Sequence, residues 1–211
     1  MRVYKFLDSH FGLVNLQQKR LKISTVEDLN DPFELLPYNI QDPSKRKALK
    51  DARERWSAAY GLVCFSGGWT DPILWAHYGD KHKGLCLGFE VAPNTVTEVR
   101  YVDDRLTLPD VIEDAHGTEW MTTKFSHWAY EREFRSWRTL KNVPKFDGLY
   151  FQNFGASLRL VQVIAGARCA ITRNQSLDAI GPSAHEVELT KGRAGFGKFE
   201  IVVDQRGFLE S

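Results

Sequence analysis

Residues 64–89 read CFSGGWTDPILWAHYGDKHKGLCLGF, and this stretch decides the fold class of the chain. Apolar runs at 62–66 and 84–91 predict two short buried strands. Between them, a Thr-Asp-Pro turn predicts the start of a helix over 72–78, since proline suits the first helical turn. The connection also holds two histidines and a dense set of aromatic and charged side chains, which is typical of a binding pocket.

The rest of the chain changes irregularly between strand-like and helix-like patterns, without repeats or a clear linker. We therefore expect an α+β fold with mostly antiparallel strands, forming one domain over residues 1–211. Further strands are expected at 2–6, 21–24, 96–102, 131–137 and 158–165, with a terminal hairpin-like pair at 185–189 and 198–203. Further helices are expected at 9–20 with Ser9 as its N-cap, at 43–59, at 108–125 with acidic residues 110, 113 and 114 near its start, and at 176–180.

The composition indicates an ordinary globular protein. The chain has 211 residues, of which 43% are hydrophobic and 26% charged, so it can bury a core without disulfide or metal support. A net charge of +1 argues against a protein that coats nucleic acid, although a nucleic-acid substrate stays open. Three cysteines are too few for a disulfide framework, so we expect a reducing compartment, with Cys64 and Cys86 as structural thiols.

The N-terminus lacks the apolar stretch of a secretory signal, and no run approaches the length of a membrane-spanning helix. We therefore expect a soluble protein without membrane contact. Its expected location is the cytoplasm, or the cytoplasm of a target cell if the chain is a delivered effector. Met1 is either a native start or the first residue of an excised domain.

Glu131 and Glu133 form the carboxylate pair with the clearest chemical meaning. Two positions apart on a predicted strand, their side chains point to the same face. Neighbouring carboxylates repel, so the pKa of one of them should rise. Such a pair suits the stabilisation of an oxocarbenium-like centre and the removal of a proton from an acceptor. The alternative is a solvated strand face on which Arg135 pairs with both carboxylates.

The segment Asn30-Asp31-Pro32-Phe33-Glu34 predicts a turn fixed by side-chain-to-backbone hydrogen bonds, with Phe33 anchored on the core. Such a turn does not require two acidic groups, so Asp31 and Glu34 are also candidates to reach a cleft or a ribose hydroxyl.

The helix at 72–78 carries Trp75, His77 and Tyr78, which can stack on a ring or hydrogen-bond a phosphate. Its alternative role is packing of Trp75 and Tyr78 into the core. The basic loop 81–84 either meets a phosphate or is simply solvated. His77 and His82 are five positions apart and lack a third ligand, so we expect no metal site.

Four segments together resemble a bacterial family catalogued as a domain of unknown function, whose members often lie near phage-defence, abortive-infection or toxin loci. The resemblance covers about residues 2–138. It is carried by Tyr4-Lys5-Phe6, by the NDPFE motif at 30–34, by Trp75-x-His77-Tyr78 with His82-x-Gly84 and Gly88-Phe89, and by Trp128-x-Tyr130-Glu131-x-Glu133-x-Arg135.

More distantly, the layout is similar to that of ADP-ribosyltransferases, in which split antiparallel sheets with flanking helices hold NAD in a cleft. That family places a basic residue on its first strand, a Ser/Thr or Tyr strand end in the middle and a Glu-containing strand later. Lys5, Ser66 and the pair Glu131-x-Glu133 stand in this order here. Lys5 replaces the usual Arg or His, and it lacks the planar fork that grips a pyrophosphate.

This resemblance implies an NAD-dependent ADP-ribosyltransferase, with Glu133 at the nicotinamide ribose and Glu131 activating the acceptor. The acceptor would be a protein, RNA or DNA, and a cognate immunity protein or antitoxin is a further implied partner. An NAD glycohydrolase and a non-enzymatic nucleotide-binding sensor are the alternatives. The residues implied around NAD are Tyr4, Lys5, Asn30, Glu34, Ser66, Trp75, His77 and Tyr78.

Overall fold

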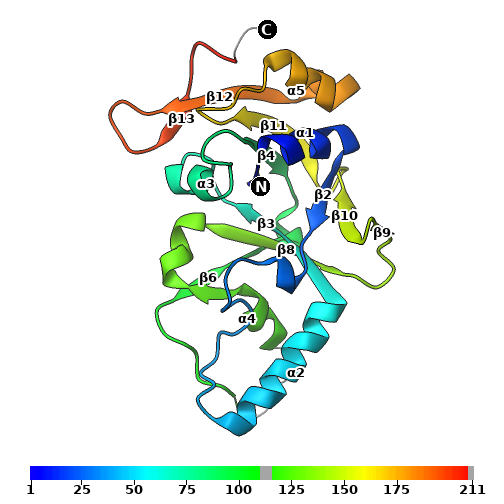
Figure 1. The fold of residues 1–211 in the computed structure, drawn as a ribbon, viewed down its shortest axis with the longest axis vertical. Coiled ribbons are helices and arrows are strands. Elements are labelled where there is room, and N and C mark those ends of the chain that lie inside the picture. The colour runs from blue at the N-terminus through cyan, green and yellow to red at the C-terminus, as the bar shows by residue number, and fades with distance from the viewer. Residues whose placement is uncertain (110–115, 209–211) are drawn as a thin grey trace. The chain divides into compact units, whose positions relative to one another are not determined.

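The computed structural model describes residues 1–109 and 116–208, which form a mixed α+β protein with a large mixed sheet and several helices (Figure 1). The predicted α+β class is therefore confirmed. The chain divides into two compact units, the first made of 1–21, 65–95 and 152–211 and the second of 22–64 and 96–151. The expectation of one domain over the whole chain stays a prediction.

The first unit is built on strands in the order β13-β12-β11-β4-β1. Strand β4 (Leu85–Glu90) pairs antiparallel with both β1 (Arg2–Leu7) and β11 (Arg159–Ala165). Strand β12 (Glu188–Ala194) runs parallel to β11 and antiparallel to β13 (Ile201–Val203). Because β4 has neighbours on both sides and is buried from 85 to 89, its sequence is almost wholly apolar.

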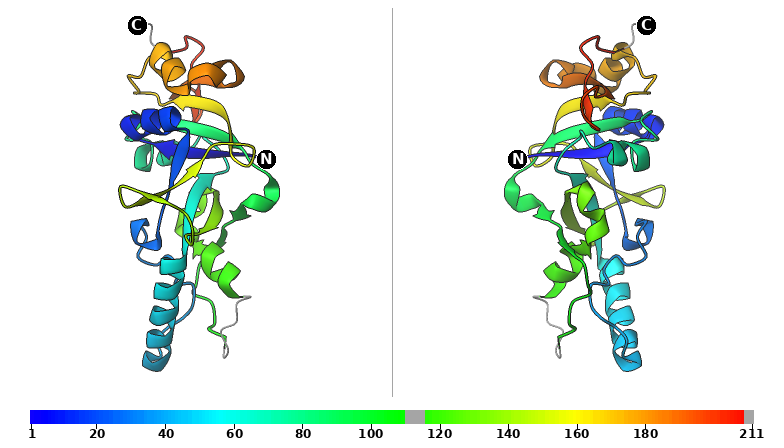
Figure 2. Two further views of the ribbon diagram at one scale, coloured as in Figure 1. Left: turned by 90° about the vertical axis from the view of Figure 1, so that its right-hand side faces the viewer. Right: turned by 90° about the vertical axis from the view of Figure 1, so that its left-hand side faces the viewer.

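Side-chain caps define the helices of the first unit. Helix α1 (Ser9–Gln18) is capped by Asp8, whose carboxylate accepts the Phe11 N–H at 2.8 Å, so the predicted Ser9 cap is wrong by one residue. Helix α3 (Pro72–His77) begins after Asp71 in the same way, and α5 (Arg173–Ile180) begins with a capping box. Helices α1 and α5 pack side by side (Figures 1 and 2).

The connection from α3 to β4 is a tight left-handed turn. Asp80, Lys81 and His82 have φ angles of +46°, +52° and +71°, a region that L residues disfavour. At Gly84, a Cβ atom would lie 2.0 Å from the carbonyl oxygen of Leu7, so only glycine fits there. Backbone strain of this kind persists only where the surrounding structure enforces it.

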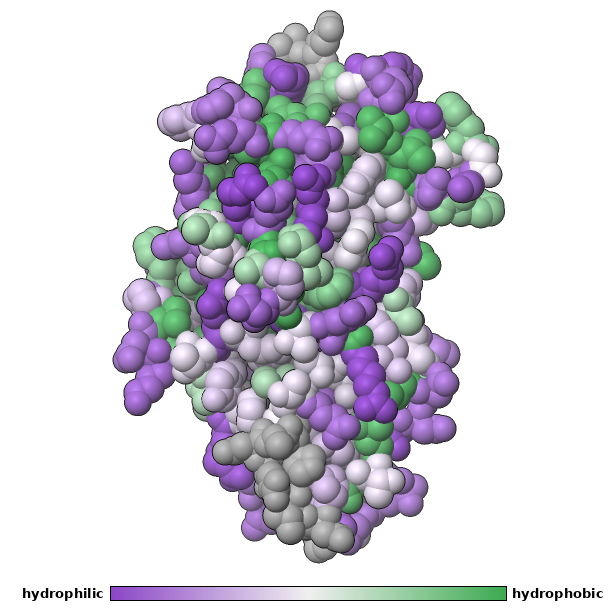
Figure 3. All heavy atoms as spheres, turned by 180° about the vertical axis from the view of Figure 1, so that it is seen from behind, coloured by the Kyte–Doolittle hydropathy of each residue, from purple (hydrophilic) through white to green (hydrophobic). Residues whose placement is uncertain are grey.

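The β12–β13 hairpin ends in an apolar tip. Phe196 and Phe199 are almost wholly exposed, and the guanidinium of Arg193 lies 4.3 Å from the centre of the Phe196 ring. Figure 3 shows hydrophobic side chains on this projecting loop. The predicted terminal hairpin is confirmed, but its first strand begins at Glu188 because a 3₁₀ helix, η4 (Gly181–Glu186), precedes it.

The second unit contains a strand set in the order β3-β8-β5 and two helices that share an apolar cluster of Tyr38, Leu49, Ala52 and Trp120. Figure 2 shows α2 as one straight helix. The strands and helices that lie in this unit or begin or end in it are β2 (Arg20–Ile23), η1 (Val26–Asp28), α2 (Pro43–Ala59), β3 (Tyr60–Ser66), β5 (Thr97–Glu98), β6 (Arg100–Val102), α4 (His116–Thr122), β7 (Thr123–Phe125), η3 (Ser126–Glu131), β8 (Glu133–Thr139), β9 (Lys145–Phe146) and β10 (Leu149–Asn153). A further 3₁₀ helix of the first unit is η2 (Pro93–Thr95).

Several expected elements differ from the structure. The helix expected to run to 125 ends at Thr122, because the next residues form β7 parallel to β6. Its expected acidic start at 110, 113 and 114 lies outside the described residues. The strand expected from 131 begins at Glu133, because Glu131 ends η3 and Arg132 has a φ of +44°. Strands β9 and β10 were not predicted.

Candidate functional site

Three glutamates and two cations meet in the interior of the second unit, and we name them the Glu133 cluster. The Arg135 guanidinium donates to Glu133 through Nε at 2.8 Å and through Nη2 at 3.0 Å, and Nη2 also donates to Glu34 at 2.8 Å. The Lys124 ammonium lies 2.6 Å from Glu131, 3.1 Å from Glu133 and 3.4 Å from Glu34. All five side chains are buried, and their formal charges sum to −1.

Unusual backbone positions bring these side chains together. Asp31 accepts the Phe33 N–H at 2.9 Å and fixes the turn, as the sequence predicted. The next residue after the buried Glu34, Leu35, has a φ of +57°, which is rare for a bulky residue. This left-handed conformation changes the direction of the backbone directly after Glu34. The left-handed Arg132 reverses the chain between η3 and β8 in a similar way, so Glu131 and Glu133 both turn inward.

Charge pairing controls the protonation of this cluster. Burial alone would raise the pKa of Glu133, but the charges of Arg135 and Lys124 and their hydrogen bonds lower it to about 2. Burial alone would lower the pKa of Lys124, but the three glutamates raise it above its ordinary value. The predicted rise in pKa by carboxylate repulsion is therefore wrong for Glu133, which lies between two cations. The alternative of a solvated face is also wrong, although Arg135 does pair with Glu133.

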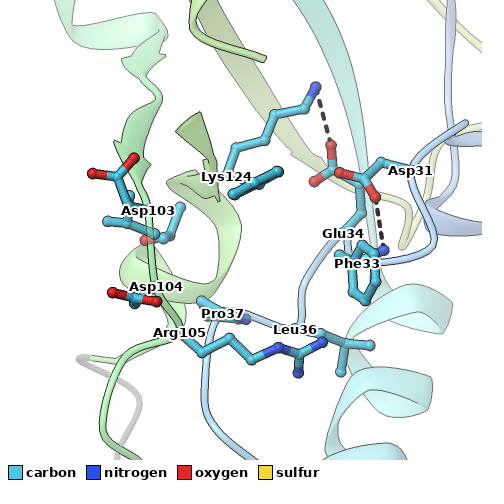
Figure 4. Close-up of a pocket in the computed structure, with 12 residues that line it drawn as sticks. Asp31, Phe33, Glu34, Leu36, Pro37, Asp103, Asp104, Arg105 and Lys124 are labelled. Atoms are coloured by element: carbon cyan, nitrogen blue, oxygen red, sulfur yellow. Dashed lines mark hydrogen bonds and ion pairs between the residues drawn. The ribbon is translucent and has the colours of Figure 1, made fainter. Parts of the chain in front are cut away.

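A cavity of about 380 Å³ opens beside the cluster, and we name it the Phe33 pocket (Figure 4). Phe33 is 57% exposed and Phe125 is 42% exposed, so the prediction that Phe33 is anchored on the core is wrong. The guanidinium of Arg105 lies 5.2 Å from the centre of the Phe33 ring. The pocket is lined by Asp31, Phe33, Glu34, Leu36, Pro37, Val102, Asp103, Asp104, Arg105, Thr123, Lys124 and Phe125.

Figure 4 shows Glu34 and Lys124 joined at one end of the pocket, with the carboxylates of Asp103 and Asp104 turned away from them. Two polar atoms of lining residues, Glu34 Oε2 and Thr123 Oγ1, are buried without a hydrogen-bond partner within the described residues. Both atoms are inaccessible to solvent, so a ligand in the cavity would reach them only after these side chains move.

Glu131, Glu133 and Glu34 are thus brought together by the structure, and Asn30 lies at the exposed start of the same turn. The other predicted site residues belong to the first unit. There, Tyr4 faces Ser66 across the β1–β3 ladder, and Lys5 follows on β1. Burial raises the pKa of the half-buried Tyr4 hydroxyl, and the Ser66 hydroxyl accepts the Gly68 N–H at 3.3 Å.

The aromatic residues of α3 have different surroundings. Trp75 is fully buried, packs edge-on against Phe6 at 5.0 Å and donates its ring N–H to the Trp69 carbonyl at 2.6 Å. Its ring belongs to the core, in agreement with the core-packing alternative, and stacking on a ligand would require this packing to open. His77 is exposed, and Tyr78 is half-buried.

His82 was expected in a basic loop and was not expected to bind a metal with His77, yet its surroundings are unusual. Its ring stacks on Trp75 at 6.4 Å, and its Nδ1 is buried without a hydrogen-bond partner in the described part of the chain. Burial and the nearby charge of Arg168 lower the pKa of this histidine. His82 is therefore largely neutral at pH 7.

Lys124 and Thr123 are the main residues that sequence reasoning missed. Both fall in a stretch that looks helical, and neither has a local motif that indicates a buried site. Only the pairing of β6 with β7 and the return of the chain through η3 bring Lys124 next to the glutamates. The one sequence signal for this role of Lys124 is that it lies close to Glu131 and Glu133 along the chain.

Among residues 1–109 and 116–208, no group of three or more His, Cys, Asp or Glu side chains has an arrangement that could hold a metal ion. Within the same residues, none of the helices is both long and apolar enough to cross a membrane. Comparison with protein-family models, curated proteins and solved structures gave no match to this chain.

Proposed function

We propose that this protein binds a nucleotide in the Phe33 pocket. The observation that carries the proposal is that two exposed phenylalanine rings, Phe33 and Phe125, line one cavity together with Arg105. Aromatic side chains offer faces for ring stacking, and a few fixed polar atoms give orientation. A volume of about 380 Å³ suits part of a dinucleotide or a whole nucleoside.

NAD is the nucleotide we propose first, because of the motif order that resembles ADP-ribosyltransferases. The pocket contributes Arg105 as a cation that could meet a phosphate. Glu34, one of the residues implied around NAD, lies both in the pocket wall and in the Glu133 cluster. The ADP-ribosyltransferase-like fold is part of the same proposal, and its support is the α+β class with Glu133 at the start of a later strand.

The second candidate function is transfer of ADP-ribose. Its support is that Glu131 and Glu133 share Lys124 with Glu34 of the pocket wall, although neither of the two lines the cavity itself. A group that stabilises an oxocarbenium-like centre must be ionised, and the pKa of about 2 keeps Glu133 ionised. In this reaction the bond between ribose C1′ and nicotinamide breaks and nicotinamide leaves with the electron pair. The acceptor, or water in a glycohydrolase, then bonds to C1′ and gives its proton to a base, for which Glu131 is the candidate. The protein, RNA or DNA acceptor and a defence or toxin role stay predictions.

The test is NAD binding by calorimetry and NAD consumption by chromatography, with and without cell lysate. Phe33→Ala removes an exposed ring and should weaken binding without unfolding the protein. Glu131→Gln tests the chemistry, because it leaves the hydrogen bonds between Glu133 and the buried Arg135 in place. Exposed Phe146 in β9 provides the matched control, Phe146→Ala.

Binding that Phe33→Ala weakens and Phe146→Ala does not would support nucleotide recognition in this pocket. If Glu131→Gln abolishes NAD consumption, the result supports an enzyme. Consumption that needs lysate would indicate a transferase, and consumption without lysate would indicate a glycohydrolase. Binding without consumption would favour the sensor. An absence of both would remove NAD as the ligand.

A further inference from the structure

We propose that the tip of the β12–β13 hairpin, residues 193–199, attaches this protein to the surface of a bilayer that contains anionic lipids. The tip reads RAGFGKF and projects from the sheet of the first unit (Figures 1 and 3). The inference does not rest on the proposed function, because every residue that lines the Phe33 pocket belongs to the second unit. It departs from the expectation, drawn from the sequence, of a protein without membrane contact.

The two phenylalanine rings of the tip are open to solvent on nearly all sides. Phe196 is 94% exposed and Phe199 is 101% exposed, whereas the other exposed phenylalanines of the described chain lie between 42% and 58%. Contact of apolar surface with water is unfavourable roughly in proportion to its area, so a partner that covers these rings gains free energy. A ring this open is a projection, and its partner must close around it.

The hairpin holds the rings in a defined place. Strands β12 and β13 pair up to Ala194 and Ile201, and the next N–H, that of Gly195, donates to the Glu200 carbonyl at 2.8 Å. A Cβ atom at Gly195 would lie 2.9 Å from the Lys198 carbonyl oxygen, so glycine permits the close return of the chain. Because the base of the tip is already hydrogen-bonded, attachment orders little of the backbone and its entropic cost is small.

Two cations accompany the rings. The guanidinium of Arg193 lies 4.3 Å from the centre of the Phe196 ring, and the exposed Lys198 stands between the two phenylalanines in the sequence. They are the only charged residues of the tip, so its formal charge is +2, and the next acidic residue, Glu200, is half-buried. Each lysine or arginine near an anionic membrane surface strengthens binding about fivefold.

Projecting apolar rings with flanking cations match the boundary between the headgroups and the acyl chains of an anionic bilayer. The acyl chains close around a projection of any shape, while long basic side chains keep their charges among the headgroups. A single nucleic-acid strand is held instead by a basic groove that follows its backbone, and two cations on a tip do not form one. A symmetric contact between the tips of two copies would bring like charges together.

Co-sedimentation of the full chain with vesicles tests the proposal. One set of vesicles contains phosphatidylcholine alone, and the other contains an equal amount of phosphatidylserine. We expect weak, reversible binding to the anionic vesicles, half-saturated at about 1 mM accessible lipid, because a whole myristoyl chain reaches only about 10⁴ M⁻¹. Binding should fall as salt is added and should be weaker without phosphatidylserine.

Substitution of the rings tests their part in the attachment. The double change Phe196→Ser and Phe199→Ser should weaken binding to anionic vesicles at least about tenfold. Phe146→Ser in β9, whose ring is 56% exposed, is the matched control and should bind as the original protein does. A tryptophan introduced by Phe199→Trp should be quenched by brominated lipid more strongly than one introduced by Phe146→Trp.

Substitution of the cations separates charge from apolar contact. Arg193→Gln combined with Lys198→Gln should weaken binding to anionic vesicles about twentyfold and leave binding to phosphatidylcholine unchanged. Lys47→Gln combined with Lys50→Gln, at two exposed lysines of α2, removes the same charge elsewhere and should change binding less. All these positions are exposed or half-buried, so equal urea midpoints verify that the variants are folded.

No binding to the anionic vesicles, or binding that survives loss of both rings, would overturn the proposal. Binding of oligothymidylate without binding of vesicles would overturn it in favour of a nucleic-acid strand. Self-association without binding of vesicles, abolished by loss of the rings, would overturn it in favour of a second copy. NAD takes no part in these measurements, so failure of the NAD proposal leaves their interpretation unchanged.

Discussion

Replacing Glu133 by glutamine should strongly destabilise this protein. The substitution leaves the fully buried Arg135 with an amide where two carboxylate oxygens accepted its protons at 2.8 and 3.0 Å. Removing one partner of a buried ion pair usually costs about 3–5 kcal/mol. A carboxyl whose pKa falls from 4.5 to about 2 on folding contributes about 3 kcal/mol at neutral pH, so the two arguments agree.

Equilibrium unfolding in urea, followed by tryptophan emission, measures this loss. Trp128 is a local probe, because its ring centre lies 4.8 Å from Lys124 Nζ. Glu131→Gln, which leaves both hydrogen bonds from Arg135 to Glu133 in place, should cost less than Glu133→Gln. Glu98→Gln, on the exposed strand β5, should stay within about 0.5 kcal/mol of the original protein.

The difference between the original protein and Glu133→Gln should also depend on pH. The pKa of Glu133 is lower in the folded state than in the unfolded state, so its contribution is fully present above pH 4.5 and is lost as the pH falls towards 2. The two unfolding free energies should therefore converge in acid. A Glu133→Gln protein within about 1 kcal/mol of the original at pH 7 would refute the argument from buried ion pairs.

Three further outcomes follow from the first unit. Lys81→Gly should stabilise the protein by about 1 kcal/mol in urea unfolding, because its φ of +52° suits glycine, whereas Lys83→Gly, at a residue without a positive φ, should destabilise it. His82 has a lowered pKa, so stability should decline as the pH falls below 6.5, where the unfolded chain takes up a proton first, and His82→Asn should flatten that decline. The double substitution of Phe196 and Phe199 by serine should leave the urea midpoint unchanged and reduce binding of a hydrophobic dye, and an altered midpoint would mean that these rings pack somewhere.

Local signals predicted much of the fold. The apolar runs predicted β3, β4 and β11, and the Asp-Pro pair predicted α3. These predictions succeed because strand burial and helix capping depend on residues that are close in sequence. Elements whose formation depends on distant partners were missed. Strand β10 lies between β9 and β2, which is far away in sequence, and β7 pairs with β6 across the segment that contains α4.

The candidate site was predictable in part for the same reason. The two glutamates near 131 and the NDPFE turn stand out by composition, and the structure brings Glu34 within 2.8 Å of Arg135, 101 positions away. The environment of these residues was not predictable. Sequence spacing suggested repulsion between carboxylates, but Lys124 and Arg135 surround Glu133 and reverse the expected direction of its pKa. Charge balance in a buried cluster depends on long-range contacts that a local pattern does not contain.

The division of the chain into two units has a consequence for dissecting the protein. The chain passes from one unit to the other after residues 21, 64, 95 and 151, so each unit is assembled from separate segments. Three of these junctions fall within β2, β3 and β10 rather than in loops. No single cut of the gene therefore yields either unit alone, and a truncated fragment would end in a severed strand whose unpaired edge invites aggregation. Separate production of the pocket-bearing unit requires two internal segments to be rejoined by a new linker.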